Sequence, residues 1–282
     1  MSRTILVLTA TGTVGGATVT ALRARGAAVR AATRDPGAQP WPAGVEAVRW
    51  SYDDRSTWTA ALQGVDTLFL AIPAFRPDEA EEGRAILAAA QAAGVRRVVK
   101  LSAAGVEGNP ESGHRQVEVA IEGSGLEYVL LRPTFFAENF VEFYGAPIKA
   151  EGAIYLPAGA GNTAFVAAAD IGAAAAAALL GEQTGEAWVI TGPEALDHDE
   201  VASVLSAALD KPVQYHDISP DLFEASLREH GAGEVAVATM SALYGYVRAG
   251  WTATVSPDVE RVTGRPPQRF ADWAQANAGA WR

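Results

Sequence analysis

Short apolar runs alternate with longer segments of helical periodicity through the first half of the chain. The apolar runs predict buried strands over residues 5–8, 28–32, 45–50, 67–72, 95–102 and 128–131. The segments between them predict helices over residues 17–25, 56–63, 78–93 and 113–123. Because the apolar runs lack strict alternation, we expect helices to cover both faces of the sheet, as in parallel sheets with right-handed crossovers. The pattern therefore predicts an α/β fold with a Rossmann-like, doubly wound parallel sheet.

The second half of the chain is less regular and predicts a smaller, mixed lobe. Short strands are expected over residues 188–191 and 213–217, and helices over residues 170–180, 197–209 and 220–230. Residues 257–282 predict a short helix, a turn and a terminal helix. We expect a Rossmann-like domain over residues 1–134 and a mixed α/β lobe over residues 135–282 that covers the carboxyl edge of the sheet. No low-complexity linker divides them, so the two are not strictly separable.

A turn of small residues follows the first predicted strand and opens the first predicted helix. Its pattern, Thr9-x-x-Gly12-x-x-Gly15, differs at the first position from the glycine fingerprint of dinucleotide-binding turns. Backbone N–H groups and the positive end of a helix dipole meet at such a turn, which favours binding of a pyrophosphate. A turn that serves only the fold is the alternative. The residues expected to contact the cofactor are Thr9, Thr11, Gly12, Thr13, Val14 and Gly15.

The ends of the second and fourth predicted strands supply further cofactor candidates. Arg34 stands where NAD-binding proteins carry an acidic residue. An arginine there pairs with a 2′-phosphate and stacks on adenine, which favours NADPH over NADH; a solvated surface arginine is the alternative. Ala71, Ile72 and Pro73 either line the path of the nicotinamide ribose or form an ordinary strand end.

Polar residues gather where the fifth predicted strand ends and the next helix begins. Lys100 and Ser102 close the strand, and His114 and Glu118 lie four residues apart on one face of the helix. We expect His114 to protonate the substrate oxygen as hydride arrives, because imidazole exchanges protons near neutral pH. Lys100 and Ser102 complete the expected catalytic set, and Ser102 is also a cofactor candidate. The alternative is that Glu118 pairs with Arg115 or His114 on the helix surface.

Aromatic side chains and an amide follow the sixth predicted strand, at Phe135, Phe136, Asn139 and Phe140. Apolar ring faces can sandwich a flat substrate while the amide of Asn139 orients its polar edge. We therefore expect these residues to contact an aromatic or quinone substrate. Packing in the core of the second lobe is the alternative.

Composition and absent motifs argue against several other classes of protein. The net charge of −11, without a dense Lys/Arg run, argues against a nucleic-acid partner. The chain has no cysteine, which excludes disulfides and thiolate chemistry and suits a reducing cytoplasm. The 4 histidines are scattered, so no metal site is expected. No Tyr-x-x-x-Lys or Gly-x-Ser-x-Gly motif supports a tyrosinate dehydrogenase or a serine hydrolase.

We see no signal peptide and no run long enough to cross a membrane. The longest run of small apolar residues, 173–180, is mostly alanine. It predicts a tightly packed helix, and no membrane partner is expected.

Several further motifs occur along the chain. They are His114-x-x-x-Glu118, Ser124-Gly125-Leu126, Leu131-Arg132-Pro133, Phe136-x-Glu138-Asn139-Phe140, Asp170-Ile171, Thr191-Gly192-Pro193-Glu194-Ala195-Leu196 and Gly264-Arg265-Pro266-Pro267. With the N-terminal turn, Arg34 and the strand end at residues 101–105, this set resembles the NmrA-like branch of the atypical short-chain dehydrogenases/reductases, of the NAD(P)H:quinone and azo-dye reductase type. The resemblance implies a Rossmann domain, an NADP(H) site and reduction of quinones or related conjugated carbonyls. It also implies that His114 faces the nicotinamide and the substrate. Some members of the family resemble redox-sensing regulators.

Two positions depart from the family pattern. Thr9 stands where the family usually has the first glycine of the turn, so its side chain either narrows the approach to the cofactor or demands a shifted turn. Ser51-Tyr52 replaces an aspartate followed by an apolar residue, where the aspartate normally meets the adenine. These changes predict reduced cofactor affinity or a different hold on the adenine.

The leading hypothesis is an NADPH-dependent oxidoreductase that transfers hydride to a quinone or a conjugated or aromatic carbonyl, with Ser102, His114 or water supplying the proton. One alternative is a non-catalytic, NADP(H)-sensing regulatory protein. Another is a tailoring reductase acting on a polycyclic aromatic quinone of a natural product. We expect a cytoplasmic location, and the sequence leaves the oligomeric state open, a homodimer included.

Overall fold

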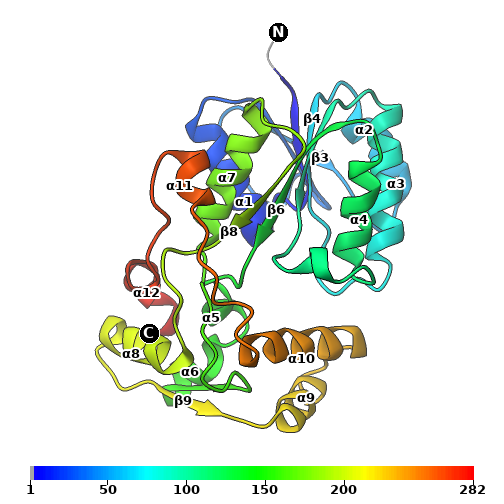
Figure 1. Ribbon diagram of the computed structural model, residues 1–282. Coiled ribbons are helices and arrows are strands. Elements are labelled where there is room, and N and C mark those ends of the chain that lie inside the picture. Colours follow the sequence, from blue (N-terminus) through cyan, green and yellow to red (C-terminus); the bar gives the residue numbers. More distant parts are fainter. Residues whose placement is uncertain (1–2) are drawn as a thin grey trace. The chain divides into compact units, whose positions relative to one another are not determined.

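A seven-stranded parallel sheet organises the Rossmann-like part of the molecule (Figure 1). The computed structural model describes residues 3–282, so the first two residues of the expected segment 1–134 lie outside the described part. The strand order is β3-β2-β1-β4-β5-β6-β8. The strands are β1 (Ile5–Val7), β2 (Val29–Thr33), β3 (Val45–Arg49), β4 (Thr67–Leu70), β5 (Arg97–Leu101), β6 (Glu127–Pro133) and β8 (Glu186–Ile190). The order reverses between β1 and β4, which is where doubly wound sheets bind ligands at the carboxyl ends of their strands.

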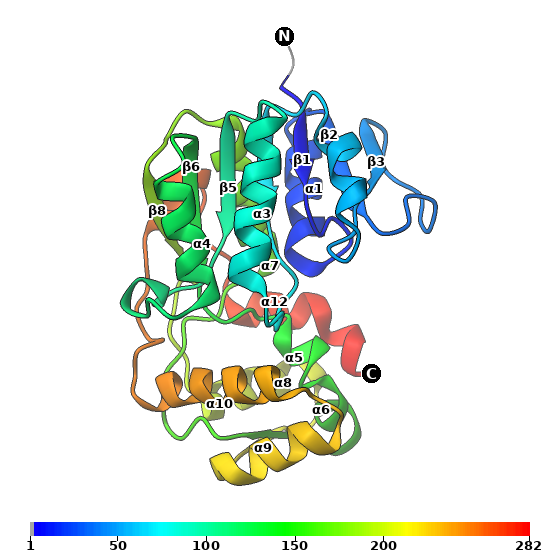
Figure 2. The same cartoon turned by 90° about the vertical axis from the view of Figure 1, so that its right-hand side faces the viewer.

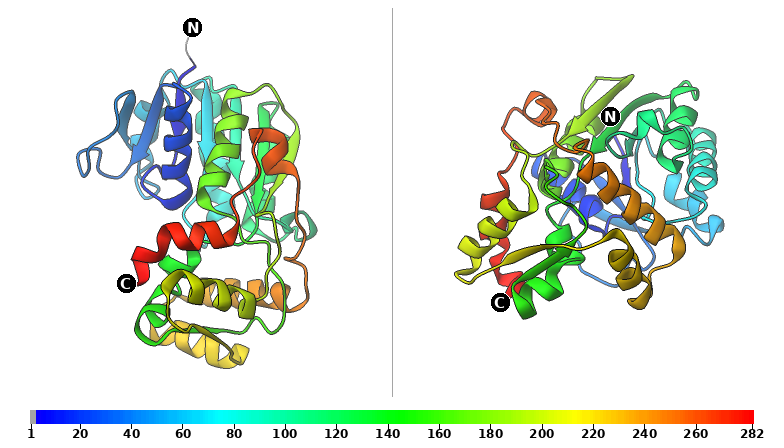
Figure 3. Two further views of the ribbon diagram at one scale, coloured as in Figure 1. Left: turned by 90° about the vertical axis from the view of Figure 1, so that its left-hand side faces the viewer. Right: turned by 60° about the horizontal axis from the view of Figure 1, so that its bottom comes forward.

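Helices cover both faces of this sheet, as the sequence predicted. One face carries α2 (Trp58–Leu62), α3 (Glu79–Ala92) and α4 (Gly113–Glu122), the last two lying in front of the sheet in Figure 2. The other face carries α1 (Thr13–Ala24) and α7 (Ala168–Leu180), which run side by side in the left view of Figure 3. Short 3₁₀ turns η1 (Arg55–Thr57) and η2 (Val106–Gly108) precede α2 and α4.

The alanine-rich helix α7 packs tightly, which confirms the prediction for the run 173–180. Ala174, Ala175 and Ala176 are fully buried. A Cβ atom on Gly172 would lie 2.5 Å from the backbone carbon of Ala17, so the axes of α7 and α1 approach too closely for larger side chains. Small residues are therefore required here by helix–helix contact.

The chain divides into two compact units that differ from the expected split at residue 134. Unit 1 comprises Met1–Pro133, Ala168–Ile190 and Arg261–Gly264, and unit 2 comprises Thr134–Ala167, Thr191–Glu260 and Arg265–Arg282. The first boundary lies beside the expected one, but α7 and β8 return to unit 1. They do so because α7 packs against α1 and β8 pairs with β6. Local sequence cannot show that a late strand completes the edge of an early sheet.

Unit 2 is a mixed α/β arrangement around a second core. The strands β7 (Ala153–Leu156) and β9 (Gln214–Asp217) pair in parallel. The helices are α5 (Asn139–Glu142), α6 (Gly145–Glu151), α8 (His198–Leu209), α9 (Pro220–Glu229), α10 (Glu234–Arg248) and α12 (Phe270–Asn277), followed by the 3₁₀ turn η3 (Ala278–Trp281). Helix α11 (Asp258–Thr263) crosses the boundary between the units along the chain.

The sequence-based prediction omits β7, α5, α6 and α10 from unit 2. The pattern of α10 includes β-branched residues and Gly245, which are weak helix formers.

Within residues 3–282, no helix combines the length and the apolar character needed to cross a membrane.

Candidate active site

The turn after β1 forms a cradle of backbone groups at the start of α1. The N–H of Gly12 donates a hydrogen bond to the Thr9 carbonyl oxygen at 2.8 Å. A Cβ atom on Gly15 would lie 2.0 Å from that same oxygen, so only glycine allows the helix to start this close to the turn. Gly12 caps α1 without a side-chain hydrogen bond, and the first turn holds no acidic residue. The site therefore fits a pyrophosphate, which binds to helix N-termini through backbone N–H groups.

Thr9 keeps the turn in place by adopting a left-handed backbone conformation. Its φ angle is +50°, a value that a β-branched residue adopts only with strain. Glycine, which the family usually has at this position, adopts such angles without a Cβ clash. The departure seen in the sequence thus has a local backbone cost.

The other cofactor candidates follow β2 and β4 at the same carboxyl edge. Arg34 is exposed and makes no ion pair with any residue in the range 3–282. Ala71 is buried, and its carbonyl oxygen accepts a 2.5 Å hydrogen bond from the Tyr52 hydroxyl. Ile72 and Pro73 continue the chain beyond β4. An exposed, unpaired guanidinium at the end of β2 is compatible with pairing to a phosphate.

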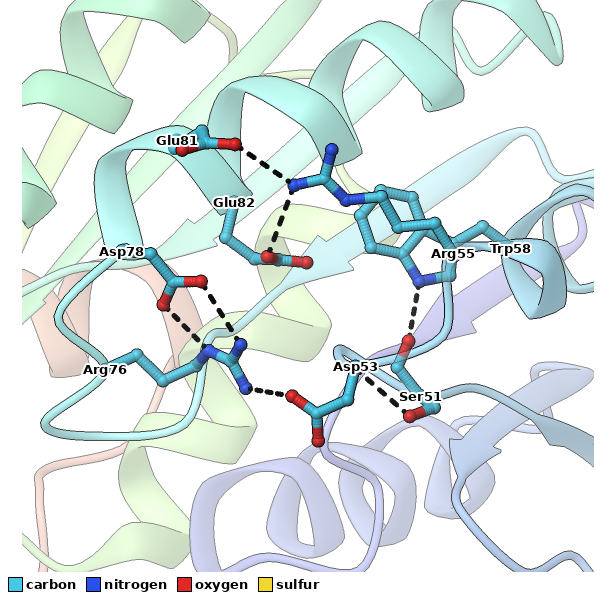
Figure 4. A network of polar contacts seen from close by, with 8 residues as sticks. All are labelled: Ser51, Asp53, Arg55, Trp58, Arg76, Asp78, Glu81 and Glu82. Atoms are coloured by element: carbon cyan, nitrogen blue, oxygen red, sulfur yellow. Dashed lines mark hydrogen bonds and ion pairs between the residues drawn. The ribbon is translucent and has the colours of Figure 1, made fainter.

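The loops after β3 and β4 are tied together by ion pairs (Figure 4). The guanidinium of Arg76 contacts Asp53 at 3.1 Å and Asp78 at 3.2 Å. The backbone carbonyl of Ser51 accepts a 2.8 Å hydrogen bond from the Trp58 indole. Through its backbone carbonyl, Ser51 therefore holds the start of α2.

The structure brings Lys100 and His114 together, as their positions at a strand end and a helix start suggest. Lys100 is fully buried on β5, and its ammonium nitrogen Nζ lies 3.1 Å from Nδ1 of His114. The same Nζ donates to the backbone carbonyl of Leu101. Ser102 follows β5 and is 4% exposed. The three catalytic candidates thus share one end of β5.

Glu79, which the sequence analysis missed, completes this cluster. Its carboxylate oxygen Oε1 lies 2.6 Å from Nδ1 of His114 and 3.6 Å from Nζ of Lys100. Burial acts to raise the pKa of Glu79, but His114 and Lys100 outweigh that effect and the pKa is lowered. Burial lowers the pKa of Lys100, and the charges of Glu79 and Glu118 offset only part of that effect. Two bases and one carboxylate therefore share a small, largely buried volume.

Two glycines bring Glu79 to this place. A Cβ atom on Gly83 would lie 2.4 Å from a methyl of Val117, so α3 and α4 pack closely. A Cβ atom on Gly113 would lie 2.8 Å from the Glu79 carboxylate. One feature of the sequence could have indicated that Glu79 lies near His114. The helices α3 and α4 follow the neighbouring strands β4 and β5, so both helices begin at the same edge of the sheet.

Glu118 pairs with arginines and not with His114. The guanidinium of Arg132 binds its carboxylate at 3.0 and 2.8 Å, and Arg115 contacts it at 3.0 Å. The side chain is fully buried. Burial acts to raise the pKa of Glu118, but the hydrogen bonds from Arg132 and its neighbours, together with the Arg132 charge, outweigh burial and lower that pKa. Glu118 therefore anchors β6 to α4, beside the cluster.

The aromatic candidates after β6 belong to unit 2. Phe140 is fully buried, with its ring 5.2 Å from Phe165 and 5.7 Å from Tyr144. Phe135 packs against Phe165 and is half-buried, as are Phe136 and Asn139. Phe140 thus packs in the core of the second lobe, the alternative given for this set, and a contact of the four residues with substrate stays a prediction.

The comparison with protein families decides the relationship. Residues 1–250 match the NmrA-like family. The chain belongs to this family. An NAD(P)H azoreductase of Xenophilus azovorans is 33% identical over 98% of the chain and 99% of its own length. A (4-alkanoyl-5-oxo-2,5-dihydrofuran-3-yl)methyl phosphate reductase of Streptomyces griseus is 34% identical over 98% of the chain and 99% of its own length.

Solved structures agree with this NmrA-like assignment. A crystal structure of an NADPH-dependent quinone oxidoreductase from Escherichia coli, complexed with NADPH, has a TM-score of 0.84 and 25% identity, covering 96% of this chain and 99% of its own. The predicted resemblance and the predicted Rossmann-like fold are both confirmed.

Within residues 3–282, no group of three or more His, Cys, Asp or Glu side chains is arranged to hold a metal ion.

Proposed function

We propose that this protein is an NADPH-dependent reductase that transfers a hydride to a quinone or to another conjugated or aromatic carbonyl. The observation that carries the proposal is full-length similarity, at 33% and 34% identity, to two reductases. The cluster of Lys100, His114 and Glu79 at the carboxyl edge of the sheet adds a suitable source of protons. The names of the two relatives indicate different acceptors. They therefore support the type of reaction, a reduction, but do not single out one substrate.

The cofactor site combines the glycine turn with residues from three neighbouring strand ends. Arg34 pairs with the 2′-phosphate, which makes NADPH the preferred cofactor over NADH. When bound, the nicotinamide supplies the hydride. The residues proposed to hold the cofactor are Thr9, Thr11, Gly12, Thr13, Val14, Gly15, Arg34, Ala71, Ile72, Pro73 and Ser102.

The acceptor receives its proton from His114, with Lys100 in contact with the ring and Ser102 at the same strand end. In unit 2, the half-buried Phe136 and Asn139 supply a ring face and an amide to the substrate. Phe135 and Phe140, which also follow β6, both pack against Phe165. We also propose a cytoplasmic location, which a chain without cysteine suits. Light scattering of the purified protein tests whether it forms a homodimer.

An acceptor panel tests the reductase. The protein is incubated with NADPH and quinones from single-ring to polycyclic, while loss of the reduced cofactor is followed by its absorbance. We expect acceptor-dependent oxidation, and Arg34→Asp should shift the preference from NADPH towards NADH. Tight NADPH binding without oxidation by any acceptor would instead favour a regulatory protein. In that case a pull-down with each redox form of the cofactor would reveal its partner.

A further inference from the structure

We propose that Glu79 and Lys100 form a proton relay behind His114, in which Lys100 restores a proton to Nδ1 as Nε2 gives one to the acceptor. The inference rests on the proposed function. It adds a positioning residue, Glu79, and assigns separate roles to the two nitrogens of His114.

The geometry orients the imidazole ring. Both Glu79 and Lys100 lie against Nδ1, at 2.6 and 3.1 Å. Nε2 sits on the other side of the ring and has no hydrogen bond within residues 3–282. The His114 side chain is 34% exposed, whereas Lys100 is fully buried. Nδ1 therefore contacts Lys100 and Glu79, and Nε2 is the nitrogen that can donate to the acceptor.

The charges around the cluster allow one proton to be shared. Glu79 is the carboxylate that faces both bases, from the first turn of α3. Glu118 on α4 also acts on Lys100, but its charge is balanced by Arg132 and Arg115. One negative charge of Glu79 thus supports one positive charge, held by Lys100 or by His114.

When Lys100 is the donor to Nδ1, either location of that charge leaves a hydrogen on Nε2. If Lys100 is charged, it donates to Nδ1, and the neutral ring carries its hydrogen on Nε2. If His114 is charged, both ring nitrogens carry hydrogen and Nδ1 forms the ion pair with Glu79. Donation by Lys100 to Nδ1 thereby favours the tautomer with its hydrogen on Nε2, the one that can donate to the acceptor.

The transfer balances in protons and electrons. When the conjugated acceptor takes a hydride from the reduced nicotinamide, an electron pair moves onto its carbonyl oxygen. That oxygen bonds to the proton of Nε2, and a proton of Lys100 moves to Nδ1. Lys100 is left neutral, the form that burial favours, and a proton from solvent returns through the exposed Nε2.

Nitrogen NMR of the imidazole of His114 in the cofactor-free protein tests the relay. Lys100→Met removes the donor to Nδ1 but keeps Glu79, so the neutral ring should shift from the Nε2–H to the Nδ1–H tautomer. Glu79→Gln keeps the shape and removes the charge that faces Nδ1 at 2.6 Å, so the nitrogen signals of the His114 ring should move. Glu81→Gln, an exposed change on the same helix, is the matched control and should alter neither signal.

Kinetics supply the second readout. We expect Glu79→Gln and Lys100→Met to lower kcat for the best acceptor by about 10²-fold, within the usual range for general acid catalysis, with NADPH affinity unchanged. Circular dichroism verifies that each variant is folded. If Lys100→Met is not, Lys100→Arg replaces it in the kinetics alone, because a guanidinium can donate to Nδ1 but does not give up a proton, so kcat should still fall.

The outcomes separate the two proposals. Acceptor reduction together with unchanged His114 signals in both variants would overturn the relay alone. Tautomer shifts without reduction of any acceptor would refute the proposed function and, with it, the catalytic role of the relay.

Discussion

Two histidines, one in each unit, show how differently the same side chain is used. His114 in unit 1 is 34% exposed and lies 2.6 Å from a carboxylate and 3.1 Å from an ammonium group. His198 in unit 2 is 1% exposed and lies among the rings of Phe165 and Tyr215, at 5.7 and 5.3 Å. Its Nδ1 is buried without a hydrogen-bond partner within residues 3–282.

The two histidines differ in their exposure to solvent and in the charged groups that contact them. Burial lowers the pKa of His198 to about 4, because the charges of Asp197 and Asp217 offset only part of the cost of burying a charged ring. His198 therefore behaves as an aromatic packing residue at neutral pH. His114 keeps contact with both solvent and charged groups, which a group that gives and regains protons requires.

The largest expected effect concerns the buried charge beside the His114 cluster. Glu118→Ala leaves the Arg132 guanidinium, 12% exposed, without its main partner. Breaking a buried ion pair from one side typically costs about 3 to 5 kcal/mol of unfolding free energy. Urea denaturation measures this loss, and Glu122→Ala, a more exposed change on the same helix, is the control. Equal losses in both variants would show that burial at Glu118 carries no special weight.

The pH dependence of stability tests the His198 side of the comparison. The pKa is about 6.5 in the unfolded chain and about 4 in the folded protein, so the unfolded state binds a proton first as pH falls. Stability should therefore decline between these values and reach a loss of about 3 kcal/mol below the lower one. His198→Phe should remove this component, whereas His230→Asn, an exposed change, should retain it. An unchanged pH profile in His198→Phe would contradict the assignment.

His114→Asn should affect catalysis more than stability, the reverse of what we expect for His198→Phe. We expect kcat to fall about 10²-fold, equivalent to about 2.7 kcal/mol, because the proton donor is removed. Unfolding free energy should fall by less than in Glu118→Ala, since the His114 side chain is partly exposed and Glu79 remains to pair with Lys100. Steady-state kinetics and thermal melts on one sample check both, and a stability loss without a kinetic defect would place His114 with the packing residues.

Thr9→Gly should give the smallest change. Relief of the left-handed strain, of about 1 to 2 kcal/mol, is offset by the greater chain entropy of glycine, of roughly 0.5 to 1 kcal/mol. We expect a net gain near 1 kcal/mol in thermal melts and tighter NADPH binding by titration. Unaltered NADPH affinity would show that the native turn already fits the cofactor.

Local pattern predicted six of the seven strands of the sheet, and it predicted that Lys100 and His114 lie near each other. The strands of unit 1 were predictable because each is a short apolar run bounded by turn residues, and Lys100 and His114 because they stand at the end of one strand and the start of the next helix. Glu79 was not, because its contact with His114 depends on the close packing of α3 and α4 at Gly83 and Gly113. The return of α7 and β8 to unit 1 depends on pairing between distant segments, which local periodicity does not encode.

The most direct test of the account is the stoichiometry of NADPH oxidation with the best quinone, compared between the wild type and His114→Asn at saturating NADPH. The account predicts one NADPH oxidised for each acceptor reduced, with turnover lost in His114→Asn while NADPH affinity is kept. Tight NADPH binding with no oxidation by any quinone in the wild-type protein would contradict it.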